Sequence, residues 1–99
     1  LKAFKRQKWT IKMKIRNMRS PKGNTVPNQF NCVDDNGNEY FQSYNSVIVK
    51  KESDKIYLDK RTWNYSVTTS RYRNIFLDES TKETQKKIDS GEYILTDLN

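Results

Sequence analysis

Residues 8–16, KWTIKMKIR, alternate strictly between apolar and polar, mostly basic, side chains, and this alternation restricts the fold more than any other feature of the chain. It is typical of a half-buried β-strand, because successive side chains of a strand point to opposite faces of the sheet. One face carries Trp9, Ile11, Met13 and Ile15, and the other carries Lys8, Lys12, Lys14 and Arg16. We therefore expect a strand over residues 8–18 with its apolar face in the core and its basic face outward.

The segments that follow predict more strands. Residues 19–27 hold both prolines and predict a loop. Four further segments predict strands: residues 29–34, 39–44, 46–51 and 55–59. Residues 46–51 either continue the strand at 39–44 or form a strand of their own. Asn36-Gly37 predicts a hairpin between the first two of these, because both residues tolerate the positive φ of a tight turn.

After residue 63 the spacing of apolar side chains becomes helical. Val67, the aliphatic stem of Arg71, and Ile75 recur at every fourth position. Tyr72 and Phe76 form a neighbouring pair with the same spacing. Side chains four residues apart lie on one side of a helix, so the segment predicts an amphipathic helix.

The ends of two helices can also be predicted. The first begins after Ser66 or Thr69 and ends near position 78. Residues 80–83, Ser-Thr-Lys-Glu, match a capping box, which predicts a second helix that ends near position 90, where Gly91 suits a left-handed cap. Residues 92–99 then predict a last strand.

Together these elements predict an α+β fold, in which an antiparallel sheet is followed by two short helices on one face and a final edge strand. We expect residues 8–99 to form a single domain and residues 1–7 to be a basic arm or an expression-tag remnant that the domain does not need for folding. The expected core consists of Trp9, Ile11, Phe30, Phe41, Val49, Tyr72, Phe76 and Ile88.

The positive charge of the chain is concentrated in its first third. Residues 1–33 contain nine Lys and Arg and no acid, whereas residues 34–99 contain ten basic residues and all twelve acids. Such asymmetry indicates an anionic partner for the first third, with nucleic acid ahead of an acidic protein surface or an anionic membrane. A solvated basic segment that only aids solubility is the alternative.

Composition argues against most catalytic chemistry. The chain has no histidine, and Cys32 is its only cysteine, which excludes an internal disulfide and fits a reducing compartment. No nucleotide-binding loop, zinc spacing or nucleophile elbow is present. Residues 34–39, DDNGNE, lack the glycine at the sixth position and the bidentate glutamate at the twelfth position of a calcium loop. We expect a protein that is not an enzyme, uses no cofactor or metal, and does not cross a membrane.

Two further segments are candidates for binding. In residues 68–73, TTSRYR, hydroxyl groups near a helix start precede Arg71 and Arg73, which could bind phosphate or could simply be solvated or ion-paired. In residues 40–44, YFQSY, Tyr40, Gln42 and Tyr44 share one strand face. They could stack on unpaired bases, or they could be cross-strand packing.

Several motifs resemble one protein family. They are NQF at residues 28–30, YFQSYNS at 40–46, W-x-Y-S-x-T-T-S-x-Y-R-N-x-F-L at 63–77 and SGEYILTDLN at 90–99. With these motifs the chain resembles an uncharacterised family of small bacteriophage-encoded proteins. The resemblance implies a phage protein that works in the bacterial host cytoplasm, and it implies no site residues.

The sequence thus favours a small, basic phage protein that binds DNA or RNA through phosphate contacts without reading sequence. The alternative is a phage protein that binds and modulates a host protein. The expected nucleic-acid-binding residues are Lys8, Lys12, Lys14, Arg16, Arg19, Arg71, Arg73, Tyr40 and Tyr44.

Overall fold

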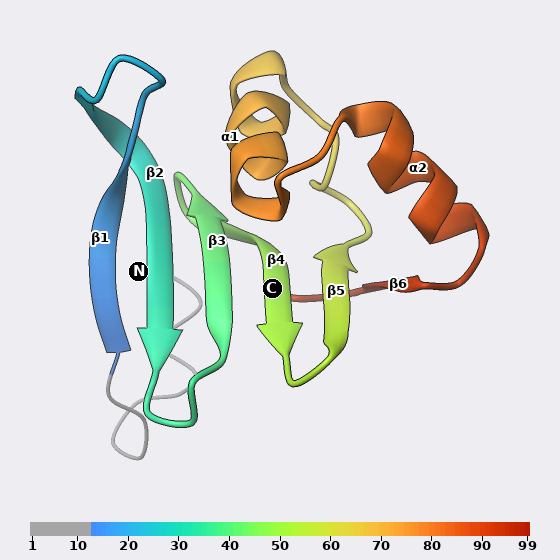
Figure 1. Ribbon diagram of the computed structural model, residues 1–99. Coiled ribbons are helices and arrows are strands. Elements are labelled where there is room, and N and C mark those ends of the chain that lie inside the picture. The colour runs from blue at the N-terminus through green and yellow to red at the C-terminus, as the bar shows by residue number, and fades with distance from the viewer. Residues whose placement is uncertain (1–12) are drawn as a thin grey trace.

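The computed structural model describes residues 13–99, and in this part of the chain two helices lie on one face of a six-stranded sheet (Figure 1). The elements follow in the order β1 (Met13–Arg19), β2 (Thr25–Asp34), β3 (Glu39–Ser43), β4 (Ser46–Glu52), β5 (Lys55–Asp59), α1 (Val67–Leu77), α2 (Thr81–Asp89) and β6 (Tyr93–Thr96). The strands lie side by side in chain order. The α+β prediction is confirmed, including the final edge strand.

The first five strands form an antiparallel meander, whereas β6 pairs with β5 in parallel. A parallel neighbour requires a crossover, and α1 and α2 together provide it. Residues 46–51 belong to a separate strand, because Tyr44 and Asn45 form a two-residue turn in which Tyr44 has a φ of 54°. The predicted strand at residues 55–59 is confirmed.

Strand β2 is longer than predicted, since it begins at Thr25 within the expected loop. Pro27 is tolerated there because the sheet is irregular around it. In β2, Phe30 and Thr25 pair with β1 but the residues between them do not, and the residues that pair with β3 begin at Gln29. Neither neighbour therefore needs the backbone N–H that proline lacks.

Both helices begin with the caps that their sequences predict. The Ser66 hydroxyl accepts a hydrogen bond from the Thr69 N–H at the start of α1. Ser80 and Glu83 form the reciprocal capping box at the start of α2. Gly91 follows α2 with a φ of 82°, as expected for a left-handed cap residue.

The core lies between the sheet and the helices. Of the predicted core residues, Phe41, Val49, Tyr72 and Phe76 are buried, and Phe41 stacks on Phe76 with 5.9 Å between ring centroids. Phe30 and Ile88 are partly buried. Trp9 and Ile11 lie outside the described residues.

Of the two rows of apolar side chains that the sequence places on α1, only the one with Tyr72 and Phe76 faces the core. The side chains at Val67, Arg71 and Ile75 are exposed, and Val67 is 78% accessible. The buried side is formed instead by Thr69, Tyr72, Arg73 and Phe76. A helix has room for one buried stripe here, and the two aromatic rings occupy it because they bury more apolar surface than Val67 and Ile75.

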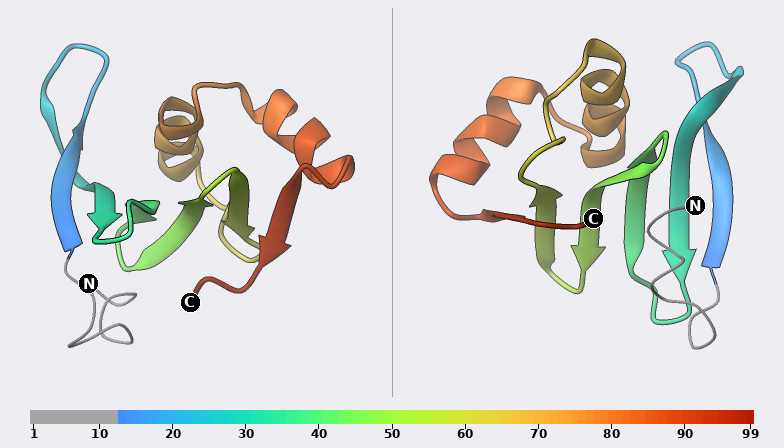
Figure 2. Two further views of the ribbon diagram at one scale, coloured as in Figure 1. Left: turned by 60° about the horizontal axis from the view of Figure 1, so that its bottom comes forward. Right: turned by 180° about the vertical axis from the view of Figure 1, so that it is seen from behind.

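The β1–β2 hairpin does not continue the floor of the sheet. Figure 2 (left) shows that this hairpin rises on the same side of the sheet as the helices. The central strands, together with residues 29–33 of β2, which pair with β3, thus form a floor, with β1 on one side and α1 on the other. This curvature brings the first strand opposite α1, although the two are more than forty residues apart in the chain.

Candidate nucleic-acid interface

The basic face of β1 is turned toward the helices. Met18 belongs to the buried cluster that packs against α1, and Arg16 and Lys14 lie two and four residues before it on the same strand face. Both basic side chains are exposed. Ile15 lies on the other face and is 45% accessible, so the expectation that it packs in the core is wrong.

A groove of about 570 Å³ separates β1 from α1. Along one side, β1 contributes Lys14, Arg16 and Arg19. Asn31 and Val33 of β2 line the floor, and Ile75 of α1 lines the opposite side. Three of the predicted basic residues are thus brought together in one concave surface.

The cations of this groove are not neutralised by neighbouring carboxylates. In the part of the chain that the structure describes, the ion pairs are Lys50–Glu52 and Lys87–Glu79, and neither involves β1. Arg19 donates a hydrogen bond from Nη1 to the Gly23 carbonyl across the hairpin loop, at 3.0 Å. Glu39 is the acidic residue that lines the groove. The positive potential of this wall is therefore available to a bound anion.

Arg71 and Arg73 have opposite environments. Arg71 is exposed and lies one turn before Ile75 on the same side of α1, but it lines a separate hollow with Tyr65 and Val67 and does not line the groove. Arg73 is fully buried, and the expectation that it binds phosphate is therefore wrong. Its place in the helix, between Tyr72 and Phe76, turns its side chain inward.

The buried guanidinium of Arg73 holds the segment before α1 against the segment after it. Its Nη1 donates to the Trp63 carbonyl, and its Nη2 donates to the Asn74 Oδ1 at 2.9 Å and to the Thr81 hydroxyl at 2.7 Å. It also lies over the Trp63 ring, 5.0 Å from the centroid. Burial lowers the pKa of Arg73, although Glu79 opposes the shift. These contacts assign Arg73 a structural role.

The two tyrosines of residues 40–44 differ as well. Tyr40 is partly buried and donates a hydrogen bond from its hydroxyl to Asp34 Oδ2 at 2.9 Å. Burial and this hydrogen bond both raise the pKa of Tyr40. Gln42 is fully buried, so it is not displayed on the sheet surface as expected. Tyr44 occupies the β3–β4 turn, where its ring is half exposed.

Two of the three hydroxyl groups in residues 68–73, those of Thr69 and Ser70, are engaged within the protein and are not presented to an anion as the sequence suggested. Thr69 is buried, and its hydroxyl lies 2.9 Å from that of Ser43 in β3. Ser70 donates to the Asn64 Oδ1 at 2.8 Å. The local side chains thus satisfy one another and anchor the helix to the sheet.

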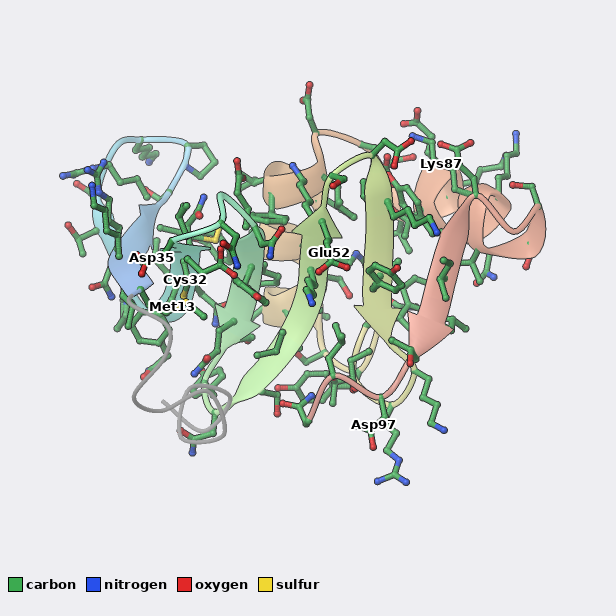
Figure 3. All side chains as sticks on the ribbon, turned by 90° about the horizontal axis from the view of Figure 1, so that it is seen from below. Met13, Cys32, Asp35, Glu52, Lys87 and Asp97 are labelled. Carbon is green, nitrogen blue, oxygen red and sulfur yellow. The ribbon has the colours of Figure 1, made fainter. Side chains whose placement is uncertain are left out.

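A second polar cluster lies far from the groove, where α2 meets β6. The Glu79 side chain is only 3% accessible and accepts hydrogen bonds from Lys87 and Tyr93, both at 2.7 Å, and from Thr84 at 2.5 Å. Burial alone would raise the pKa of Glu79, but these hydrogen bonds outweigh it and lower the pKa. Burial and the bond to Glu79 raise the pKa of Tyr93 to about 12. Figure 3 shows Lys87 at one end of the sheet and Met13 at the other, so this cluster fastens β6 and takes no part in the groove.

Sequence reasoning missed the neutral members of the groove. Asn31 and Val33 pair with β1 in the hairpin but carry no local signal of binding, and Ile75 comes close to β1 only through the curvature of the sheet. Lys8 and Lys12 lie outside the described residues.

Within residues 13–99, no set of three or more His, Cys, Asp or Glu side chains is placed to hold a metal ion. No helix of this part of the chain has the length and apolar character that a membrane crossing requires.

Comparison with known proteins gives a family but no activity. Neither the curated proteins nor the solved structures contain a match to this chain. The model of one family, described as a family of unknown function (DUF8033), matches residues 13–92, which include the whole groove. The chain therefore belongs to the DUF8033 family.

Proposed function

We propose that this chain is a small, non-enzymatic bacteriophage protein that binds nucleic acid in the cytoplasm of a bacterial host. Binding rests mainly on phosphate contacts and does not depend on base sequence. The observation that carries the proposal is the groove between β1 and α1, along which Lys14, Arg16 and Arg19 stand without a carboxylate partner among residues 13–99. Such a row of cations suits a polyanion better than it suits a small ligand.

Three neighbouring groups support the same surface. Arg71 is exposed on α1 one turn before Ile75, and Lys22 lies exposed in the loop that follows Arg19. Tyr44 lies near the Arg19 end of β1. Its backbone N–H donates a hydrogen bond to the Asn28 carbonyl at 2.7 Å, and Asn28 belongs to the irregular stretch of β2 near that end. An exposed ring at this place can stack on a base.

A salt titration of binding tests the proposal. If three to five cations neutralise phosphates, the logarithm of the affinity for single-stranded DNA falls with the logarithm of salt concentration at a slope of about −2 to −3.5. The double variant Lys14→Glu/Arg16→Glu should weaken binding at least tenfold and flatten this slope. Lys60→Glu/Arg61→Glu is the matched control, because it makes the same change of charge at exposed residues of another surface.

Either of two results would overturn the proposal. One is the absence of binding to DNA and RNA at low salt. The other is an equal loss of affinity in the two double variants, since that would mean that only the net charge of the protein matters.

One observation favours binding to a host protein as the second candidate. Tyr65 and Val67 are exposed at the start of α1, with accessibilities of 51% and 78%, and they line a shallow hollow of about 690 Å³ beside Arg71. Exposed apolar side chains next to an arginine are common at protein interfaces. A complex that forms in high salt and is lost on Tyr65→Ser would support this candidate.

A further inference from the structure

We infer that the groove between β1 and α1 takes single-stranded nucleic acid, with the phosphates along β1 and an unpaired base against Val33 and Ile75. This inference rests on the proposed function and specifies its substrate. It follows from the shape of the groove, from the placement of its cations and of Val33 and Ile75 on different elements, and from one side-chain amide on its floor that makes no hydrogen bond with any residue from 13 to 99.

The shape of the groove argues against a duplex. Proteins read duplex DNA by inserting a convex element, usually a helix, into its major groove. Here the basic residues lie in a concavity, and the facing surface of α1 forms one of its sides. A duplex would touch only the rim of this groove, whereas a single strand can lie along it, as in other single-strand-binding proteins.

The cations of the groove and its apolar residues Val33 and Ile75 lie on different elements. Its cations come from β1, whereas its floor carries Val33 and its far side carries Ile75, which is 43% accessible. A single strand has the same division, with phosphates along one edge and apolar base faces along the other. Once a base is unstacked, contact with these apolar side chains replaces part of the stacking that it has lost.

Asn31 lies where the edge of such a base would be. It pairs in register with Arg16 on one side and with Phe41 on the other, which places it at the middle of the groove floor. Its side-chain amide makes no hydrogen bond with any residue from 13 to 99 and is only partly exposed. An amide offers two donors and an acceptor, which is the set that hydrogen-bonds the edges of unpaired bases.

Fluorescence anisotropy with two labelled probes tests this inference: a twelve-nucleotide oligo(dT) single strand and a twelve-base-pair duplex. We expect the wild-type protein to bind the single strand at least tenfold more tightly than the duplex. Ile75→Ala should weaken single-strand binding at least fivefold and leave duplex binding unchanged. Asn31→Ala should reduce the differences in affinity among oligo(dT), oligo(dA) and oligo(dC).

Val67→Ala is the matched control for Ile75→Ala, because it truncates an exposed apolar residue of the same helix outside the groove. Thermal melts of each variant establish that the fold is retained. Salt-sensitive binding that is as tight for the duplex as for the single strand would overturn this inference while leaving the proposed function intact. Equal effects of Ile75→Ala and Val67→Ala would also overturn it, whereas no binding to either probe would overturn both proposals.

Discussion

Two arginines separated by one residue have different roles in this protein. Position 73 lies between Tyr72 and Phe76 on the buried side of α1, whereas position 71 points away from the core. The sequence contains this information, because a helical wheel anchored on the two aromatic residues places position 73 inward. A wheel anchored on Val67, Arg71 and Ile75 would place a different side of the helix inward. The helix buries the aromatic side because the larger rings bury more apolar surface.

The two arginines should therefore respond differently to truncation. Arg73→Ala removes the hydrogen bonds to Trp63, Asn74 and Thr81 and empties the space of a fully buried side chain, which should cost at least about 3 kcal/mol of unfolding free energy. Arg71→Ala should change stability by less than about 0.5 kcal/mol, because the side chain is exposed. Urea denaturation of both variants measures the difference. Similar stabilities would show that the Arg73 contacts are not needed for the fold.

Glu79 makes stability depend on pH. Its pKa is lowered in the folded state, so its contribution is present above the ordinary value of 4.5 and is lost as the pH falls through the lowered pKa. Glu79→Gln should destabilise the protein by at least about 1.5 kcal/mol at pH 7. The gap to the wild type should close as the pH falls below 4.5.

The exposed Glu92 provides the control for this prediction, since Glu92→Gln should have little effect at any pH. Thermal melts of the three proteins over pH 3–7 make the comparison. A gap between Glu79→Gln and the wild type that stays constant with pH would mean that the charge of Glu79 does not stabilise the fold.

At the scale of single elements, local signals predicted most of the structure. Alternation, helical caps and turn residues gave strands, helices and their ends to within a few residues, because these features depend on neighbours in the chain. Local signals failed where pairing partners decide the outcome. Strand β2 extends through Pro27 only because β1 and β3 leave that stretch unpaired, and β6 is parallel only because two helices intervene.

The capping box of α2 is a local feature whose energy can be measured. Ser80→Ala removes the acceptor of the Glu83 N–H, and it should lower stability by about 1 kcal/mol, which corresponds to a melting temperature about 4–8 °C lower. Lys82→Ala is the control, because this exposed side chain lies in the same turn of α2. Equal melting temperatures for the two variants would show that the box does not contribute to stability.

At the scale of the whole molecule, the groove is a product of sheet curvature. Alternation in residues 8–16 predicted a basic face on one strand, and that face exists in β1. It could not predict that the β1–β2 hairpin turns this face toward α1, because the twist of a six-stranded sheet depends on all of its strands. For the same reason the place of Ile75 in the groove could not be predicted, whereas Asn31 and Val33 pair with β1 but carry no local signal of binding.

Removing the charge of the acidic side chain that lines the groove should strengthen nucleic-acid binding, whereas the other groove variants should weaken it. Glu39 should repel phosphates, so Glu39→Gln should tighten nucleic-acid binding about twofold to fivefold at low salt, an effect that high salt removes. Glu92→Gln serves again as the control, since Glu92 precedes β6 at the far edge of the sheet. Unchanged or weaker binding by Glu39→Gln would place the nucleic acid elsewhere.

The central claim, that the groove between β1 and α1 is the nucleic-acid site, is tested most directly by nuclear magnetic resonance. A ¹⁵N-labelled sample is titrated with unlabelled oligo(dT), and the shifts of the backbone amides are followed. We predict that the largest shifts fall on β1, on Asn31 and Val33, and around Ile75, while α2 and β6 remain unchanged. Shifts centred on α2 and β6, or spread evenly over all exposed lysines, would contradict the claim.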